Sequence, residues 1–160
     1  ERQIIFTRDY QDMGMTTPSW QGIRKSIVSA KGALPPVDIQ VDLGRPEIEV
    51  RADRLLEKVF YNLIDNAIRY GGEKMKTIRV TSRQVPEGLV IVVEDDGTGI
   101  SPEDKARLFT RGFVRNTGFG LFLSREILSI SGISVTESGT FGEGARFEIL
   151  VPNGNFRYPE

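Results

Sequence analysis

The sequence predicts an α/β fold, a two-layer sandwich in which a mixed β-sheet carries helices on one face. Helix-spaced and strand-alternating apolar segments follow one another without the strict βαβ repeat of a parallel sheet. Several predicted strands are also adjacent along the chain, as in hairpins. The length of 160 residues is that of one domain with a substantial core. We therefore expect residues 1–160 to form a single domain.

The first third of the chain predicts a strand, a helix and a hairpin. Residues 3–10 mix β-branched and aromatic side chains, which indicates a short strand, with the tail of a preceding helix as the alternative. Thr17–Pro18 is typical of a helix start, and the expected helix runs to about Lys31. Residues 37–43 alternate apolar and polar side chains, so we expect a strand with one wet face. A hairpin would join it to a partner strand around residues 48–50.

The clearest helical pattern covers residues 53–70, with Asp53 as the expected N-cap. Its apolar side chains recur at helical spacing, so one stripe must lie against a core. Asn62, Asn66 and Arg69 follow an i, i+4, i+7 rhythm that gathers them on the flank of that stripe. Asparagine is a poor helix former, and two of them four residues apart have no rationale in helix stability. The pair is either functional or merely solvent-facing.

The second half of the chain alternates strands, turns and helices. Residues 77–85 predict a strand, and residues 89–94 form an apolar run typical of a strand buried on both faces. Ser101 and Pro102 begin a short helix with acidic residues in its first turn, which we expect to end at Phe109. The remaining expected segments are a loop over residues 110–117, a helix from Gly118 to Ile130 closed by Gly132, and strands over residues 133–137 and 145–151.

The composition excludes several classes of function. The chain has no cysteine and no histidine, which removes disulfides, thiolate and histidine–zinc sites, and serine–histidine triads. A formal net charge of −1 argues against general binding of nucleic acid or of a membrane surface. No apolar run approaches the length of a membrane span, and the N-terminal residues lack the pattern of a signal peptide.

Three glycine-bearing segments suit a nucleotide, although each also has an ordinary structural interpretation. An Asp-x-Gly-x-Gly turn, residues 95–99, follows the apolar strand, where a carboxylate needs a partner such as a purine amine. Its glycines would let a flat ring approach the backbone, and hairpin chemistry is the alternative. Gly118 and Gly120 open a helix whose free N–H groups favour phosphate, or they form a flexible helix entry. Gly142 and Gly144 resemble any β-turn.

The fixed order of these motifs resembles the nucleotide-binding domain of sensor histidine kinases, within the superfamily shared with gyrase, the Hsp90 chaperones and the MutL mismatch-repair proteins. The resemblance covers nearly the whole chain and implies a Bergerat-type ATP-binding fold. The matched motifs are an N box at residues 62–70, a first glycine box at residues 96–100, an F box at Phe109 and Phe113, a second glycine box at residues 118–121, and a last glycine box at residues 142–147.

The resemblance also implies a role for each matched residue. Asn66 would hold Mg2+, with Asn62 close by, because a neutral amide oxygen suits a hard cation that keeps its water and phosphate ligands. Asp96 would accept a hydrogen bond from the adenine amine, and Tyr70 would pack by the ring. The loop over residues 110–117 would be the lid over the nucleotide. The other implied nucleotide contacts are Arg69, Arg111 and Arg115 at phosphate, Gly97, Gly99 and Ile100 in the first glycine box, and Gly118, Phe119, Gly120 and Leu121 around the phosphate tail.

One position separates the branches of this superfamily. The hydrolytic members and the serine-directed kinases carry a glutamate four residues before the magnesium asparagine, where this chain has Asn62. An amide cannot take a proton, so a self-sufficient ATPase is disfavoured, whereas a nitrogen nucleophile can attack without that base. Because the chain has no histidine, the phosphoacceptor is expected on a helical dimerisation domain ahead of Glu1. Residues 1–16 would then include the end of the linker from it.

The implied function is that of the ATP-binding catalytic domain of a two-component sensor histidine kinase. It would transfer the γ-phosphoryl group of Mg-ATP to a histidine outside the chain, and a response regulator would be served indirectly. We expect a cytoplasmic location and no contact of this domain with nucleic acid or membrane. Two alternatives stay open, an ATPase or serine-kinase relative, and a module that binds nucleotide only as a regulatory switch.

Overall fold

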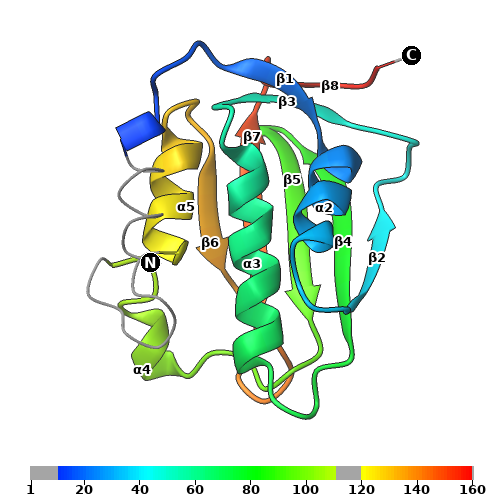
Figure 1. The fold of residues 1–160 in the computed structure, drawn as a ribbon, viewed down its shortest axis with the longest axis vertical. Helices are drawn as coiled ribbons and strands as arrows, with labels where there is room; N and C mark the ends of the chain where they lie inside the picture. Colours follow the sequence, from blue (N-terminus) through cyan, green and yellow to red (C-terminus); the bar gives the residue numbers. More distant parts are fainter. Residues whose placement is uncertain (1–10, 111–119, 160) are drawn as a thin grey trace.

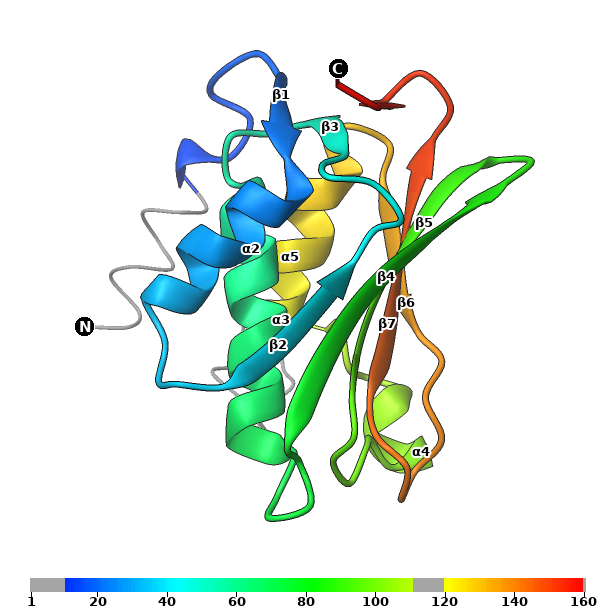
Figure 2. The same cartoon turned by 90° about the vertical axis from the view of Figure 1, so that its right-hand side faces the viewer.

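The computed structural model describes residues 11–110 and 120–159. They form two layers, a five-stranded sheet and a layer of helices against one of its faces (Figures 1 and 2). This confirms the predicted two-layer α/β sandwich. No described helix combines the length and the apolar character that crossing a bilayer demands. The helices are α2 (Ile23–Gly32), α3 (Leu56–Tyr70), α4 (Pro102–Lys105) and α5 (Gly120–Ser129).

The larger sheet is mixed, with the strand order β2-β4-β5-β7-β6. β2 runs parallel to β4, and the other neighbours are antiparallel. A second, antiparallel sheet of order β1-β3-β8 lies at the end of the molecule away from α4 (Figure 1). The strands are β1 (Ser19–Gly22), β2 (Asp38–Asp42), β3 (Glu49–Ala52), β4 (Thr77–Val85), β5 (Gly88–Asp95), β6 (Ser134–Glu137), β7 (Arg146–Pro152) and β8 (Phe156–Arg157).

β5 lies in the middle of the larger sheet and, as its apolar run predicted, is buried on both faces over most of its length. Leu89, Ile91 and Val93 belong to the core shared with the helices, while the intervening valines are buried on the other face. Side chains alternate along a strand, so Asp95, the last residue of β5, falls on the helix-covered face. This face is the one against which α3 packs.

The central helix begins three residues later than predicted. α3 starts at Leu56, and the buried Asp53 lies just ahead of it. Asp53 Oδ2 accepts a hydrogen bond from Leu55 N at 3.0 Å, and its Oδ1 accepts one from Gly14 N at 3.0 Å. Asp53 therefore satisfies a backbone N–H group near the start of α3. It also holds the backbone around Gly14 against the start of this helix.

The predicted helix start at Thr17–Pro18 is wrong. The residues that follow it form β1, which pairs with β3, and α2 begins only at Ile23. The first turn of α2 is satisfied from a distance, since Glu47 Oε1 accepts a hydrogen bond from Arg24 N at 2.8 Å. A cap supplied by a distant residue leaves no local signal in the sequence. Thr17–Pro18 has the pattern of a local helix cap, although no helix begins there.

The predicted hairpin between residues 37–43 and 48–50 is also wrong. β2 pairs in parallel with β4, and β3 joins the second sheet, so the intervening turn passes from one sheet to the other. β8, a strand of only two residues, was not predicted. The strand expected over residues 3–10 lies outside the described residues, as does all but Thr110 of the expected loop over residues 110–117.

The helix predicted after the glycine turn is confirmed at its start. Ser101 Oγ accepts a hydrogen bond from Asp104 N at 3.2 Å, which is the expected N-cap, and Pro102 occupies the first turn. α4 ends at Lys105, four residues before the predicted end at Phe109. Phe109 instead packs its ring edge-to-face on Phe147, with ring centroids 6.3 Å apart.

Candidate functional site

Most of the predicted site residues meet at one end of the sandwich, where α3 and β5 end and α5 begins (Figures 1 and 2). The turn after β5 is bonded to the end of α3, because Thr98 N donates to Gly71 O at 3.0 Å and Thr98 Oγ1 donates to Tyr70 O at 3.3 Å. Thr98 O accepts from Gly142 N at 2.6 Å, which attaches the turn between β6 and β7. Three turns far apart in sequence therefore form one rim.

The turns of this rim lie so close together that several positions have no room for a side chain and need glycine. A Cβ on Gly97 would lie 2.5 Å from Gly71 O, and one on Gly99 would lie 3.0 Å from Gly144 O. Gly144 combines a φ of 126° with a position at which a Cβ would lie 1.9 Å from Asp95 O. The sequence-based interpretation was that these glycines let a ligand ring approach. At their Cβ positions the neighbour is the protein's own backbone.

We expect Gly144→Ala to lower the free energy of unfolding by more than the matched control Gly142→Ala does. Both glycines have positive φ, 126° and 95°, so a side chain is strained at either by on the order of 1–3 kcal/mol. A Cβ at Gly142 meets nothing within 4 Å, whereas one at Gly144 collides with the Asp95 carbonyl. Urea unfolding of the two variants measures the difference. Equal losses would mean that the contact between the turns relaxes without cost.

Asp95 and Asp96, adjacent at the end of β5, lie in different environments. Asp95 is partly buried, and its Oδ1 accepts hydrogen bonds from Gly97 N at 2.8 Å and from Ala145 N at 3.4 Å. Its Oδ2 accepts no hydrogen bond from the described part of the chain. Asp96 is exposed, and its Oδ1 accepts from the backbone N–H groups of residues 76 and 77 at 2.7 and 3.1 Å.

The pKa values of the two carboxyls shift in opposite directions. Burial raises the pKa of Asp95, although the N–H groups of Gly97 and Ala145 oppose that shift. Hydrogen bonds from the N–H groups of Lys76 and Thr77 lower the pKa of Asp96. Each carboxylate has its Oδ1 engaged by two backbone N–H groups and an Oδ2 without a hydrogen bond from the described residues. What separates them is position, because Asp95 is partly buried on the helix-covered face whereas Asp96 is exposed.

These environments favour Asp95, rather than the predicted Asp96, as the carboxylate that meets a ligand. The sequence contained two signals for it. Counting back from Gly97 in the Asp-x-Gly-x-Gly turn reaches Asp95, and strand alternation puts Asp95 on the face of the core residues Ile91 and Val93. The prediction of Asp96 did not weigh these signals, and it stays a prediction.

Asn66 lies on α3 with only 8 % of its surface exposed. No hydrogen bond from the described residues engages its side-chain amide. Among those residues, the fully enclosed side-chain atoms that lack a hydrogen bond are Ser131 Oγ and Glu137 Oε1, so the Asn66 amide is not sealed from the surface. Its amide is therefore open to water or to a ligand, and no described side chain competes for it.

Asn62, one turn earlier on α3, is engaged with α5. Its Nδ2 donates to Gly120 O at 2.9 Å and to Ser124 Oγ at 3.0 Å. Ser124 Oγ in turn donates to Gly120 O at 2.8 Å. This network fixes the first turn of α5 against α3, so Asn62 positions the helix start that was predicted to face phosphate. Ser124 was not predicted, although it shares a helix face with the apolar Leu121 and Leu128.

Arg69 and Tyr70 stand at the end of α3, as predicted, but Arg69 is paired. Its Nε lies 2.9 Å from Oδ1 and 3.0 Å from Oδ2 of Asp65, one turn earlier, and this carboxylate raises the pKa of the guanidinium. The Arg69 side chain is about half exposed, so its terminal nitrogens remain accessible to an anion. Tyr70 is partly buried beside the glycine turn, to which its carbonyl is bonded.

The remaining predicted residues divide into core positions and positions without a described structure. Ile100 is buried in the core, and Gly120 and Leu121 are buried at the start of α5. The side chains of Ile100 and Leu121 therefore belong to the core. The predicted residues that lie outside the described ranges, and whose contacts stay predictions, are Arg111, Phe113, Arg115, Gly118 and Phe119.

Fold and site together define a class of protein. A two-layer sandwich with an asparagine-bearing helix, a carboxylate ending the central strand and a glycine rim joining them is the arrangement of a Bergerat-type nucleotide-binding domain. Residues 51–155 match the family described as histidine kinase-, DNA gyrase B- and HSP90-like ATPase. The match covers more than half of the 160 residues, so the chain belongs to this family.

Its relatives include sensor kinases. The alginate biosynthesis sensor protein KinB of Pseudomonas aeruginosa is 34% identical over 129 residues, 76% of this chain and 21% of KinB. The histidine protein kinase DivJ of Caulobacter vibrioides is 32% identical over 136 residues, 78% of this chain and 21% of DivJ. Full-length ShkA, solved in complex with AMPPNP, shares the fold with a TM-score of 0.74 at 20% identity, over 94% of this chain and 36% of ShkA. The chain therefore spans about a fifth of the length of these two curated relatives.

Proposed function

We propose that this chain is the ATP-binding catalytic domain of a sensor histidine kinase, which transfers the γ-phosphoryl group of ATP to a histidine on another domain of the same protein. The observation that carries the proposal is the partly buried Asp95 carboxylate, on the face of the sheet covered by the helix that bears Asn66. Family membership supports the nucleotide, and the sensor kinases among the relatives support the reaction.

Asp95 would accept a hydrogen bond from the exocyclic amine of adenine. No described residue hydrogen-bonds its Oδ2, and hydrogen bonds to a charged acceptor contribute about 1.5–3 kcal/mol. The rim of glycine turns would hold this carboxylate rigidly, because its Oδ1 is already bonded to the N–H groups of Gly97 and Ala145. Tyr70 lies beside the same turn, where it would border the ring.

Asn66 would supply the protein ligand to Mg2+. The ion keeps several waters and usually takes one or two protein oxygens together with substrate phosphates, so a single nearly buried and unengaged amide fits it. When bound, Mg2+ would neutralise charge that develops on the phosphates. The first turn of α5, which Asn62 holds in place, would offer backbone N–H groups to the phosphate tail. Arg69 would add a positive charge near the same phosphates.

No proton acceptor occupies the position from which a hydrolytic relative activates water. Asn62 stands there, and its amide nitrogen is committed to Gly120 and Ser124. We therefore expect the domain alone to hydrolyse ATP only slowly, with turnover that depends on an added phosphoacceptor. A phosphate-release assay with and without the acceptor measures this. Rapid hydrolysis by the domain alone would favour the ATPase alternative.

Under this proposal the immediate partner is a histidine-bearing dimerisation domain of the same protein, and the phosphoryl group passes from it to a response regulator. We propose a cytoplasmic location, because the reaction consumes ATP. No contact with nucleic acid or membrane is proposed for this domain, in keeping with its formal net charge of −1.

The deciding experiment supplies labelled ATP and Mg2+ to the chain together with the dimerisation domain of the same protein. We expect an acid-labile, base-stable phosphohistidine on the added domain and none when its histidine is replaced by alanine. ATP binding without any transfer would favour a nucleotide-dependent regulatory module. Transfer to a serine hydroxyl, which would give an acid-stable phosphoserine, would favour a serine-kinase relative.

A further inference from the structure

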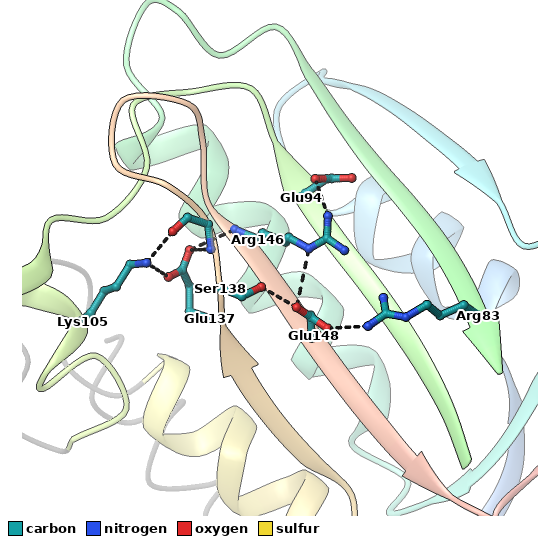
Figure 3. Close-up of polar contacts among 8 residues, drawn as sticks. Arg83, Glu94, Lys105, Glu137, Ser138, Arg146 and Glu148 are labelled. Atoms are coloured by element: carbon teal, nitrogen blue, oxygen red, sulfur yellow. Dashed lines mark hydrogen bonds and ion pairs between the residues drawn. The ribbon is translucent and has the colours of Figure 1, made fainter. Parts of the chain in front are cut away.

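A buried carboxylate beside the candidate site has no role in the proposed function. The Glu137 side chain, at the end of β6, is 2 % exposed. Its Oε2 accepts hydrogen bonds from Gly139 N and Arg146 N, both at 3.0 Å. Its Oε1 lies 3.0 Å from Lys105 Nζ (Figure 3). A buried charge without a partner costs free energy, so the buried Glu137 carboxylate depends on this ion pair.

Lys105 connects α4 to the turn between β6 and β7. It is the last residue of α4, the helix that follows the glycine turn after β5. From there its Nζ also donates to Gly139 O in the turn between β6 and β7. Within the described chain, Oε1 of Glu137 makes no hydrogen bond, and its ion-pair partner is the Lys105 ammonium. The two residues therefore fasten α4 to the β6–β7 turn.

The ion pair between Lys105 and Glu137 lies next to Asp95, the carboxylate proposed to accept the adenine amine. Glu137 and Asp95 accept hydrogen bonds from consecutive amides at the start of β7, Glu137 from Arg146 N at 3.0 Å and Asp95 from Ala145 N at 3.4 Å. Burial is the main cause of the raised pKa of Asp95, and the negative charge of Glu137 adds to it. A cation on Glu137 reduces that effect.

The other charged groups around Asp95 do not replace Lys105. Asp96, next in the chain, also raises the pKa of Asp95. Glu94, Glu143 and Arg146 line the same surface depression of about 510 Å³ as Asp95. Arg146 is shared between two carboxylates, with its guanidinium nitrogens 3.4 Å from Glu94 Oε2 and 3.6 Å from Glu148 Oε2 (Figure 3). Lys105 is thus the cation that contacts Glu137 in the described chain.

We propose that Lys105 is a positioning residue for nucleotide binding. Through its ion pair with Glu137 it fixes the β6–β7 turn that hydrogen-bonds Asp95, and it compensates the charge that would otherwise hinder ionisation of Asp95. The inference rests on the proposed role of Asp95 as the acceptor of the adenine amine. Because Lys105 belongs to α4, the inference gives this helix a role in nucleotide binding that none of the sequence motifs indicates.

The test compares Lys105→Met, Lys105→Arg, Glu137→Gln and the double variant Lys105→Met/Glu137→Gln with the wild type. Carboxyl ¹³C NMR follows the titration of Asp95 in the nucleotide-free chain, and calorimetry follows ATP affinity from pH 5.5 to 8. In Lys105→Met we expect the Asp95 midpoint to move to higher pH and ATP to bind about 3- to 10-fold more weakly, with the larger loss toward the acid end of this range. Glu137→Gln should move the midpoint to lower pH.

The control variants separate charge from fold. Lys105→Arg keeps the ion pair and should bind ATP like the wild type. The double variant removes both charges, so it should fold even where Lys105→Met is unstable with a buried unpaired carboxylate. Its ATP affinity should lie between those of Lys105→Met and the wild type, because the charge on Glu137 is gone but the ion pair that fixes the turn is also missing. An Asp95 midpoint that is unchanged in both Lys105→Met and Glu137→Gln would overturn the inference. A double variant that folds but binds as weakly as Lys105→Met would overturn it as well.

Failure of this inference can be told from failure of the proposed function. If the wild type binds ATP, Asp95→Asn does not, and the Lys105 variants bind like the wild type, only the role of Lys105 is overturned. If Asp95→Asn binds ATP like the wild type, the role of Asp95 is lost and the positioning role falls with it. The NMR midpoints of the free chain report the coupling between the charges in either case.

Discussion

Asp95→Asn is expected to weaken ATP binding about 10- to 100-fold. The substitution keeps the size of the side chain but removes the charge, and a charged acceptor contributes about 1.5–3 kcal/mol to such a hydrogen bond. The asparagine amide also presents an N–H group toward the adenine amine if it rotates to keep the hydrogen bond from Gly97 N on its oxygen. Calorimetric titration with a non-hydrolysable ATP analogue measures the affinity directly.

The matched control is Asp96→Asn, the same chemical change one residue further along. Asp96 is exposed, and its carboxylate is engaged with the N–H groups of Lys76 and Thr77 at the start of β4. We expect its ATP affinity to stay within about twofold of the wild type, with only a slight loss of stability. The reverse result, loss of binding in Asp96→Asn and none in Asp95→Asn, would restore the sequence-based assignment.

Stability gives an independent check on Asp95. Its folded-state pKa is raised, so the folded state disfavours the charged form. Such a group contributes stability below its unfolded pKa and loses that contribution as the pH rises through its folded pKa. At neutral pH the empty Asp95→Asn domain should therefore be at least as stable as the wild type, and the difference should vanish toward acid pH. Thermal unfolding without nucleotide tests this, and a strongly destabilised variant at pH 7 would contradict it.

The elements predicted correctly are those whose pattern is local and long. β4 and β5 follow from alternation and from an apolar run, and α3 follows from a stripe of four turns. The Ser101 cap was predictable because its partner lies three residues away. In contrast, β1, β3 and β8 are short strands whose pairing is decided by distant residues, and the start of α2 is satisfied by Glu47. No local pattern carries that information.

The same distinction holds for the candidate site. The motif order placed α3, the glycine turn and the start of α5 together, because each motif has its own spacing. It did not distinguish Asp95 from Asp96, since that choice depends on which face of β5 each side chain takes. The roles of Ser124, Lys105 and Glu137 depend on contacts between segments far apart in sequence. Those contacts are visible only once the turns are packed against one another.

Asn66→Ala is expected to lower phosphoryl transfer by at least about 100-fold at saturating Mg-ATP. An amide oxygen that holds Mg2+ helps place the ion where charge develops on the phosphates, and such placement is most of what a protein contributes to phosphoryl transfer. Removing a hydrogen bond is not the cause, since no described residue bonds to the Asn66 side chain. The measurement is the rate of phosphohistidine formation on the supplied dimerisation domain.

The control for Asn66 separates the metal from the nucleotide. In the presence of a chelator, ADP should bind Asn66→Ala and the wild type with similar affinity, because under the proposed function Asp95 and the rim, not Asn66, would hold adenine. Adding Mg2+ should tighten nucleotide binding to the wild type but have little effect on Asn66→Ala. Asn66→Asp places a charge on a side chain that is only 8 % exposed, so the empty variant should be less stable and regain stability with Mg-ADP. Equal responses to Mg2+ in the wild type and Asn66→Ala would remove Asn66 from the metal site, and with it the reason for two asparagines on this face of α3.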